Sequence, residues 1–486
     1  MATRGCHERT GLDPLGRRHG PAHRARRGRR RTGVSKISTL FEHQVADPAL
    51  LAWTSADTAR LERLQRTLGQ VELLRPVVRH GQVTIQATQY VGVIRLGPRT
   101  IQVLPKMHRS GLPAADAVPA ATRNLLHLLA YTLRVPIHEQ AIAPLLQQDA
   151  DWFEILTGIF ARHLADEWGR GAHRGYQAVD AELGVMKGQW HVAEQIRRPA
   201  SAHRFTVTYD EFTADNQLNR VFRYVVERLA ARTRHPGNAR RLSLLRQLLD
   251  EIALLPIVTA ADAPPSLITR LNARYAPLLN LARLFLAQDA PQLGGGTLDT
   301  FAFVFDMNRL FEDFIAEFIR RHRATILPPA WQDCELLVQT QGATLHLATQ
   351  AGGRQSFELR PDLAFRLAGA FPLLLDTKYK QLKDTDAKLG VAQGDFYQMY
   401  AYAQRYHCPR VLLLYPQTAG LDAPLQVPFA ADGPGGAAVI TAATVDLRGD
   451  LGQATVRQAL QARLRTLFDS FIRETTDEYP GAGLAS

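Results

Sequence analysis

The stretch FPLLLDTKYK, residues 371–380, decides what can be expected of the C-terminal third of this chain. Apolar or neutral residues lead directly into Asp376, as they do in a buried strand. Successive side chains of a strand point to opposite faces, so Asp376 and Lys378 share one face and Thr377 lies on the other. The sequence therefore predicts a carboxylate and an ammonium side by side at the end of a buried strand.

Such a pair suits the hydrolysis of a phosphodiester. A carboxylate binds a hard cation such as Mg²⁺, or Mn²⁺ in its place, through oxygen. A nearby ammonium can orient or deprotonate the attacking water and offset charge on the phosphate. Arginine is a poor substitute, because its charge is dispersed and does not titrate. Only 7 of the 58 basic residues are lysines, so the presence of Lys378 fits this role.

A second triplet with the same spacing, Asp386-Ala387-Lys388, shows that the spacing alone carries little weight. This decoy triplet lies in the polar segment KDTDAK, and no apolar strand precedes it. Strand context therefore favours Asp376 and Lys378.

A further acid precedes the strand. Pro361-Asp362 lies in the strand-like segment SFELRPDLAFRLA, residues 356–368. Adjacent antiparallel strands would bring Asp362 beside Asp376, which would give one cation two carboxylates.

Helical residues on both sides of these strands could complete the site. Gln398 and Tyr402 are four positions apart on an expected helix and therefore share a face. Glu312, on the helix before the strands, could supply a third acid. Each residue alone has an ordinary explanation, such as a solvated glutamine or a core tyrosine. Their order around one sheet favours a metal-dependent nuclease site over a purely structural set.

The elements around this site alternate between helices and strands. Strands are expected at 334–341, 343–350, 356–368, 371–380, 410–416 and 439–447, and helices at 303–323, 390–406 and 453–475. This order predicts an α/β domain with one mixed sheet over residues 298–480.

The preceding residues are predicted to form two further regions, so that the whole chain has a mixed α+β fold. Residues 37–115 are predicted to form a small α/β domain. Residues 116–290 show mainly helical spacing and form the helical middle region. A helix is expected at 55–69 with Ser55 as its N-cap, strands at 83–97, 99–106 and 203–212, a turn at Gly97-Pro98, helices at 125–133, 152–171, 219–234 and 239–255, and a linker at Pro291–Thr297.

Composition restricts the class of protein less than the net charge of +12 suggests. Residues 1–36 hold eleven basic residues and two acids, so this Arg-rich extension accounts for most of the excess. It is predicted to be disordered, and is either a functional arm or sequence upstream of a start near Val34. The three cysteines form no CxxC pair, and no apolar run approaches the ~20 residues of a membrane span. We therefore expect a cytoplasmic protein.

Several motifs together resemble the McrC family, the cleavage subunit of McrBC restriction systems, which act on modified DNA in phage defence. These are RPD (360–362), LLLDTKYK (373–380), DFYQMYAYA (395–403), MNRLFEDFIAEFI (307–319), TYDEFTADNQLNR (208–220) and YVGVIRLGPRTIQVLPK (90–106). The resemblance covers roughly residues 37–480. It implies a restriction-endonuclease-like domain of the PD-(D/E)xK type. The implied site comprises the metal ligands Asp362, Asp376 and Glu312, the catalytic lysine Lys378, and the pair Gln398 and Tyr402.

The resemblance also implies partners. Relatives of this type act with a AAA+ GTPase ring, McrB, which recognises modified double-stranded DNA such as DNA containing 5-methylcytosine. Residues 37–290 would then dock on the ring and stimulate its GTPase activity. The chain itself lacks a GxxxxGK[ST] motif, so it is not expected to bind nucleotide. Arg95, Arg99 and Lys106 could contact the ring, although solvated charge at a strand edge is the expected explanation for them.

Two other functions stay open. The chain could be a non-catalytic adaptor that activates a AAA+ ring and keeps a nuclease fold as scaffold. It could also be a stand-alone DNA repair nuclease. The complete set of two acids and a lysine argues against the adaptor.

Overall fold

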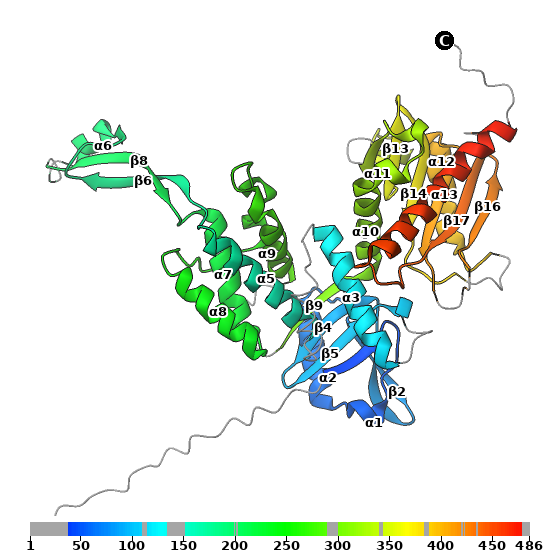
Figure 1. Cartoon of the computed structure of the whole chain (residues 1–486), viewed down its shortest axis with the longest axis horizontal. Coiled ribbons are helices and arrows are strands. Elements are labelled where there is room, and N and C mark those ends of the chain that lie inside the picture. Colours follow the sequence, from blue (N-terminus) through cyan, green and yellow to red (C-terminus); the bar gives the residue numbers. More distant parts are fainter. Residues whose placement is uncertain are drawn as a thin grey trace, which may run out of the picture. The chain divides into compact units, whose positions relative to one another are not determined.

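Two larger sheets and three smaller ones organise this computed structural model (Figure 1). It describes residues 37–108, 114–133, 151–198, 200, 203–288, 300–339, 344–382, 388–418, 421, 423–433 and 436–478. The Arg-rich extension, the expected linker at Pro291–Thr297 and Asp386 of the decoy triplet lie outside the described residues.

The first larger sheet has the strand order β1-β5-β4-β9. Its strands are β1 (Ile37–Phe41), β4 (Tyr90–Leu96), β5 (Arg99–Leu104) and β9 (Thr300–Asp306). β1 runs parallel to β5, and β4 pairs antiparallel with both β5 and β9. Gly97 adopts φ +65° in the expected turn between β4 and β5. A strand from the C-terminal part of the chain thus completes the N-terminal sheet.

The pairing of β4 with β9 corrects one expectation. A helix was predicted to start at residue 303, but Phe303–Asp306 are strand residues and α10 (Met307–Arg321) begins after them. Short apolar runs such as FAFVF do not distinguish a buried strand from a helix. Gly92 allows the close approach, because a Cβ at this position would lie 2.2 Å from the carbonyl oxygen of Phe303.

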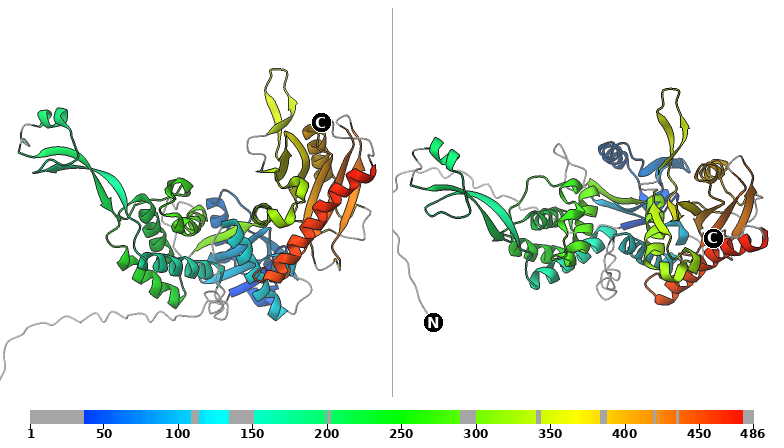
Figure 2. Two further views of the ribbon diagram at one scale, coloured as in Figure 1. Left: turned by 45° about the horizontal axis from the view of Figure 1, so that its top comes forward. Right: turned by 90° about the horizontal axis from the view of Figure 1, so that it is seen from above.

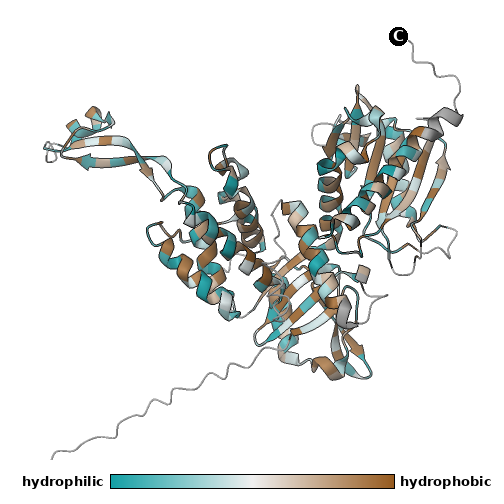
Figure 3. Ribbon diagram, viewed as in Figure 1, coloured by the Kyte–Doolittle hydropathy of each residue, from teal (hydrophilic) through white to brown (hydrophobic). Residues whose placement is uncertain are grey.

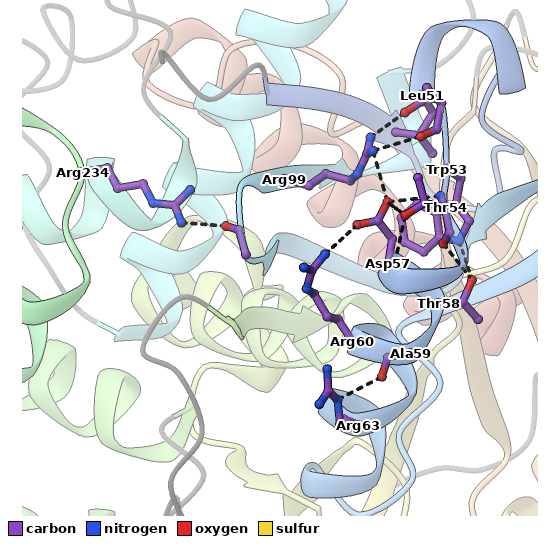
Figure 4. Close-up of polar contacts among 12 residues, drawn as sticks. Leu51, Trp53, Thr54, Asp57, Thr58, Ala59, Arg60, Arg63, Arg99 and Arg234 are labelled. Atoms are coloured by element: carbon purple, nitrogen blue, oxygen red, sulfur yellow. Dashed lines mark hydrogen bonds and ion pairs between the residues drawn. The ribbon is translucent and has the colours of Figure 1, made fainter. Parts of the chain in front are cut away.

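A helical layer and a hairpin accompany the first sheet. They are α1 (Pro48–Leu51), α2 (Ser55–Thr67), β2 (Leu74–Arg79) and β3 (Gln82–Ala87). Thr54, rather than the expected Ser55, caps α2 and forms a capping box with Asp57. Figure 4 shows Arg99 pointing to this cap, where it pairs with Asp57 at 3.2 Å and donates to carbonyls at the end of α1. Arg99 is therefore engaged within the chain.

Arg95 and Lys106 also differ from the solvated charges that were expected. Arg95 is only 2% exposed and pairs with Asp151 at 2.7 Å and Glu154 at 2.9 Å. Lys106, at the start of the 3-10 helix η1 (Lys106–His108), donates to the carbonyl oxygen of Tyr379 at 3.0 Å. Alternation along a strand predicts which face a residue occupies, but not that another element covers that face.

The helical middle region contains one more sheet than the spacing predicted. Its helices are α3 (Ala114–Leu133), α5 (Trp152–Gly169), α6 (Val192–Arg197), α7 (Gln217–Arg232), α8 (Pro236–Leu248) and α9 (Ala276–Gln288), with 3-10 turns η3 (Ala260–Asp262), η4 (Pro265–Leu267) and η5 (Ala273–Tyr275). The strands β6 (Gly175–Leu183), β7 (Gln189–Trp190) and β8 (Phe205–Thr213) form a sheet in the order β6-β8-β7. Only the third of these strands was expected.

The second larger sheet is mixed and six-stranded, in the order β10-β13-β14-β15-β17-β16. Its strands are β10 (Glu335–Val338), β13 (Leu363–Leu367), β14 (Ala370–Thr377), β15 (Arg410–Pro416), β16 (Gln426–Ala431) and β17 (Ala438–Val445). The expected strand over 356–368 is broken: Gln355–Leu359 forms β12, which pairs with β11 (Leu345–Thr349) outside this sheet. The break leaves Pro361 and Asp362 directly before β13.

Helices cover both faces of the six-stranded sheet (Figure 2). One face packs on α10 and α13 (Ala454–Glu478), and the other packs on α12 (Gln393–Tyr406). Leu373 and Leu375 of β14 belong to the first face, and Leu374 belongs to the second. The central strands are strongly hydrophobic (Figure 3), as expected for strands covered on both sides. The short elements α11 (Arg323–Ile326) and η6 (Pro329–Trp331) link α10 to β10.

The described part of the chain therefore has a mixed α+β fold, as the sequence predicted. None of its described helices combines the length and the apolar character that crossing a membrane requires.

Candidate active site

The register of β13 and β14 brings the two predicted aspartates together. The strands are antiparallel and pair Leu363 with Leu375, so Asp362, directly before β13, comes next to Asp376 of β14. Asp376 has the same parity as Leu374, which faces α12. The expected neighbourhood of Asp362 and Asp376 is thus present, at the edge where β14 ends.

Lys378 joins Asp376 to helix α12. Its Nζ lies 2.6 Å from Oδ2 of Asp376 and donates to Oε1 of Gln398 at 3.2 Å. Gln398 in turn donates from Nε2 to the hydroxyl of Tyr402 at 2.7 Å. Residues four apart on a helix can meet in this way. The predicted lysine and the predicted Gln–Tyr pair therefore form one connected group with Asp376.

Thr377 holds the other aspartate, although the sequence only placed it on the opposite face of the strand. Its backbone N and its Oγ1 both donate to Oδ2 of Asp362, each at 2.7 Å. Two donors on one oxygen fix the orientation of the carboxylate and leave Oδ1 for another partner. The strand alternation could not reveal this bond, because it assigns residues to faces and does not name the partner of a side chain.

Glu312 reaches the same place from α10. Its Oε1 accepts a hydrogen bond from Nε2 of Gln339 at 2.8 Å, and the backbone N of Gln339 donates to the carbonyl oxygen of Asp362 at 2.8 Å. Gln339 adopts φ +49°, which non-glycine residues rarely do. Gln339 thus links the third predicted acid to Asp362, and no pattern in the sequence had singled it out.

Burial raises the pKa values of the three carboxyl groups, and the charge of Asp362 adds to this effect on the other two. Burial raises the pKa of Asp376 to about 7, and the charge of Asp362 adds to this effect. Burial and Asp362 likewise raise the pKa of Glu312 to about 7. Burial also raises the pKa of Asp362, against the opposing bonds from Thr377. A nearby cation would stabilise the charged forms of these buried acids.

The ammonium group next to them stays charged. Burial opposes ionisation of Lys378, but the neighbouring carboxylate of Asp376 outweighs it and raises the pKa of Lys378. The site therefore combines a surplus of negative charge with one fixed positive charge.

These residues fit a hard divalent cation held by a few protein oxygens. Oδ2 of Asp376 is buried, and the ammonium of Lys378 lies 2.6 Å from it. Among the described residues, no group of three or more acidic, histidine or cysteine side chains is arranged to hold a metal ion. Mg²⁺ commonly keeps several waters and takes one or two carboxylates. Asp362 and Asp376, with Glu312 nearby, could hold such an ion.

Comparisons with known proteins assign the chain to a family. A family model described as the McrBC 5-methylcytosine restriction system component matches residues 85–416, which is more than half of the chain. The chain belongs to the McrBC family. No curated protein matches it significantly.

Solved structures resemble this McrBC-family chain in fold. One belongs to a half-complex from a tetradecameric assembly of Thermococcus gammatolerans McrB AAA+ hexamers with bound McrC. It matches with a TM-score of 0.61 and 22% identity, over 89% of this chain and 100% of that chain. Another, from the McrBC complex of the same organism, matches with a TM-score of 0.45 and 23% identity, over 59% of this chain and 88% of that chain. The first match shows a shared fold, and the match to the family model rests on sequence alone.

Proposed function

We propose that this chain is the nuclease subunit of a McrBC-like, modification-dependent restriction system. Its six-stranded sheet with α10, α12 and α13 would then be a PD-(D/E)xK nuclease domain. The convergence of two carboxylates on adjacent strands with the ammonium of Lys378 carries this proposal. A purely structural set has little reason to bury Asp362 and Asp376 side by side, because burial raises the pKa values of both.

Each side chain has a role that its contacts allow. Asp362 and Asp376, with Glu312, would hold Mg²⁺ or Mn²⁺, and the bound ion would activate water and stabilise charge on the phosphate. Lys378 would orient the attacking water and offset negative charge on the scissile phosphate. Gln398, itself held by Tyr402, keeps the ammonium of Lys378 in place.

A bond in this site leads to a specific prediction. Thr377→Val removes one of the two donors on Oδ2 of Asp362 and keeps the shape of the side chain. A hydrogen bond to a charged group contributes ~1.5–3 kcal/mol, so we expect DNA cleavage to fall about tenfold or more. The loss should come with weaker Mn²⁺ binding, measured by calorimetry.

Thr122→Val is the matched control for this variant. Oγ1 of Thr122 also donates to an oxygen, the carbonyl of Val118, but within α3. It should cleave DNA as the wild type does. Unchanged cleavage and Mn²⁺ affinity in Thr377→Val would show that Asp362 needs no such orientation.

We further propose that residues 37–290 dock on a AAA+ GTPase ring of the McrB type. The half-complex from Thermococcus gammatolerans contains McrB AAA+ hexamers with bound McrC. The chain of that complex which matches this one shares its fold. The hairpin of β6 and β8 offers an apolar surface for contact. Tyr176 and Phe212 pair across it with ring centroids 5.1 Å apart, and they are 75% and 54% exposed. Exposed aromatic pairs of this kind are typical anchors of protein interfaces.

Replacing this aromatic pair is expected to weaken binding of the ring. Tyr176→Ser combined with Phe212→Ser should reduce affinity at least tenfold, because central aromatic residues contribute ≥ ~2 kcal/mol each. Analytical ultracentrifugation with the GTP-loaded ring measures this. Leu271→Ser is the control, since Leu271 is 96% exposed on the same region but lies outside the hairpin. Equal affinity in both variants would refute the assignment of the hairpin.

Co-expression with the AAA+ partner tests the function itself. The purified complex is expected to cut 5-methylcytosine-containing duplex DNA, and not unmethylated DNA, only when GTP and Mg²⁺ are present. Stimulated GTPase activity without cleavage, in Mg²⁺ and in Mn²⁺, would identify the chain as an adaptor. Cleavage by the purified chain alone, without nucleotide, would identify a stand-alone nuclease.

A further inference from the structure

Tyr379, the residue after Lys378, is anchored at both polar ends by residues that follow strands β1 and β5 of the first sheet. Its hydroxyl donates to Oε2 of Glu42 at 2.8 Å, and its carbonyl oxygen accepts from Nζ of Lys106 at 3.0 Å. The Nζ of Lys106 also lies 4.4 Å from the centroid of the Tyr379 ring. Two residues that lie more than 270 positions away in sequence thus hold the neighbour of the proposed catalytic lysine.

Glu42 is the centre of this anchor. It follows β1, is fully buried, and accepts from the backbone N of Lys106 at 2.9 Å as well as from Tyr379. Its Oε1 has no hydrogen-bond partner among the described residues. Burial raises the pKa of Glu42 to about 7, so the fold disfavours its ionised form. Stability alone therefore gives little reason for a carboxyl group at this position.

The ring of Tyr379 contacts the helix that carries Glu312. It packs against Phe311 with centroids 5.8 Å apart, and Phe311 directly precedes Glu312 on α10. On the other side, the backbone N of Lys378 donates to the carbonyl oxygen of Leu414 at 2.9 Å. The chain around Lys378 is thus fixed by β15 on one side and by the first sheet on the other.

We propose that Glu42, Lys106 and Tyr379 are positioning residues that set the place of the Lys378 ammonium, which makes the N-terminal sheet a part of the nuclease site. This inference rests on the proposed nuclease function. Without the anchor, β14 would end in a segment free to shift relative to Asp376. A displacement of about 1 Å in a reacting group can cost on the order of 100-fold in rate.

Single substitutions in the full chain, reconstituted with its ring, test the anchor. Tyr379→Phe removes the hydroxyl but keeps the ring on Phe311. We expect kcat for DNA cleavage to fall about tenfold with KM unchanged, because one hydrogen bond to a charged group is lost. Glu42→Ala should lower kcat at least as much. Glu42→Gln, which keeps an oxygen for both donors, should restore kcat to within about threefold of wild type.

Tyr275→Phe is the matched control. Tyr275 is also fully buried, and its hydroxyl donates to the carbonyl oxygen of Gly171 at 3.0 Å in the helical middle region. Its substitution should cost similar stability without changing kcat. If kcat fell as much in Tyr275→Phe as in Tyr379→Phe, the effect would come from lower stability and not from positioning of Lys378. An unchanged kcat in Tyr379→Phe would overturn the proposal.

Hydrogen–deuterium exchange separates this inference from the proposed function. In Tyr379→Phe and Glu42→Ala, amides of residues 376–380 are expected to exchange at least about tenfold faster, while those of 410–416 stay protected. Unchanged exchange over 376–380 would overturn the anchor whether or not the chain cleaves DNA. Failure of the wild-type complex to cleave would instead count against the nuclease function.

Discussion

Asp376→Asn is expected to abolish DNA cleavage and at the same time to raise the thermal stability of the metal-free protein. The substitution removes a carboxylate proposed to hold the metal and to pair with Lys378, so cleavage should fall at least ~1000-fold, in the range of losses of directly acting groups. It also removes the repulsion between Asp376 and Asp362. A site that stores unfavourable charge for function gains stability when the charge is removed.

The pH dependence of the change in Tm shows whether the charge of Asp376 causes it. In the folded protein the pKa of Asp376 is raised from 3.8 to about 7, so the fold disfavours the ionised carboxylate. This penalty is fully present above pH 7 and disappears as the pH falls towards the unfolded value near 4. The Tm of Asp376→Asn in metal-free buffer should therefore exceed that of the wild type at pH 8 and equal it near pH 4.

The decoy triplet supplies the control for this variant. Asp386→Asn changes the same residue type, two positions before a lysine, and should alter neither cleavage nor the pH dependence of Tm. A lower Tm of Asp376→Asn at pH 8 would mean that the carboxylate stabilises the fold through Lys378. Cleavage that persists in Asp376→Asn would remove Asp376 from the site.

Local patterns predicted the elements that carry the site. The apolar run before Asp376 became β14, the stretch at 410–416 became β15 with the same bounds, and Gln398 and Tyr402 met on one helix as their spacing required. The antiparallel pairing that places Asp362 beside Asp376 was also predicted, because the two segments are separated by a short turn. The spacing of apolar residues and the closeness of the two segments in sequence were enough to predict these features.

Contacts between distant segments could not be predicted in this way. The pairing of β9 with β4 joins residues about two hundred positions apart, and no alternation pattern names a partner strand. The left-handed conformation of Gln339 and the bond from Thr377 to Asp362 likewise left no mark in the apolar pattern. The strand β6 was missed because none of its residues is buried, so no run of core-facing apolar residues marks it.

The largest error concerned Arg95, and correcting it gives the second major prediction. Arg95→Met is expected to destabilise the protein by about 3–5 kcal/mol, the usual cost of leaving buried charges without their partner. The guanidinium pairs with Asp151 and Glu154 and also donates to the carbonyl oxygen of Arg232 at 2.8 Å. Few other single changes distant from the proposed nuclease site should cost as much.

The two acids respond differently to their burial. Burial raises the pKa of Asp151 in spite of Arg95. Burial also opposes ionisation of Glu154, but Arg95 and hydrogen bonds from Arg234, Thr233 and Asn238 outweigh it and lower its pKa. Without Arg95, Asp151 can take up a proton, while Glu154 keeps three other donors. The loss should therefore be larger at pH 8 than at pH 5.

Urea unfolding of Arg95→Met at pH 8 and pH 5 measures this loss. Arg246→Met is the control, because Arg246 is half exposed in its pair with Glu227 and such surface pairs contribute only ~0–1 kcal/mol. Adding Asp151→Asn to Arg95→Met should recover part of the stability, since the unpaired charge is then removed. If Arg95→Met costs no more than Arg246→Met, the buried network does not join β4 to α5 energetically. Suppose instead that Arg95→Met costs the expected free energy and Asp151→Asn restores part of it. Arg95, which was expected to be a solvated charge at a strand edge, then holds the helical middle region on the first sheet.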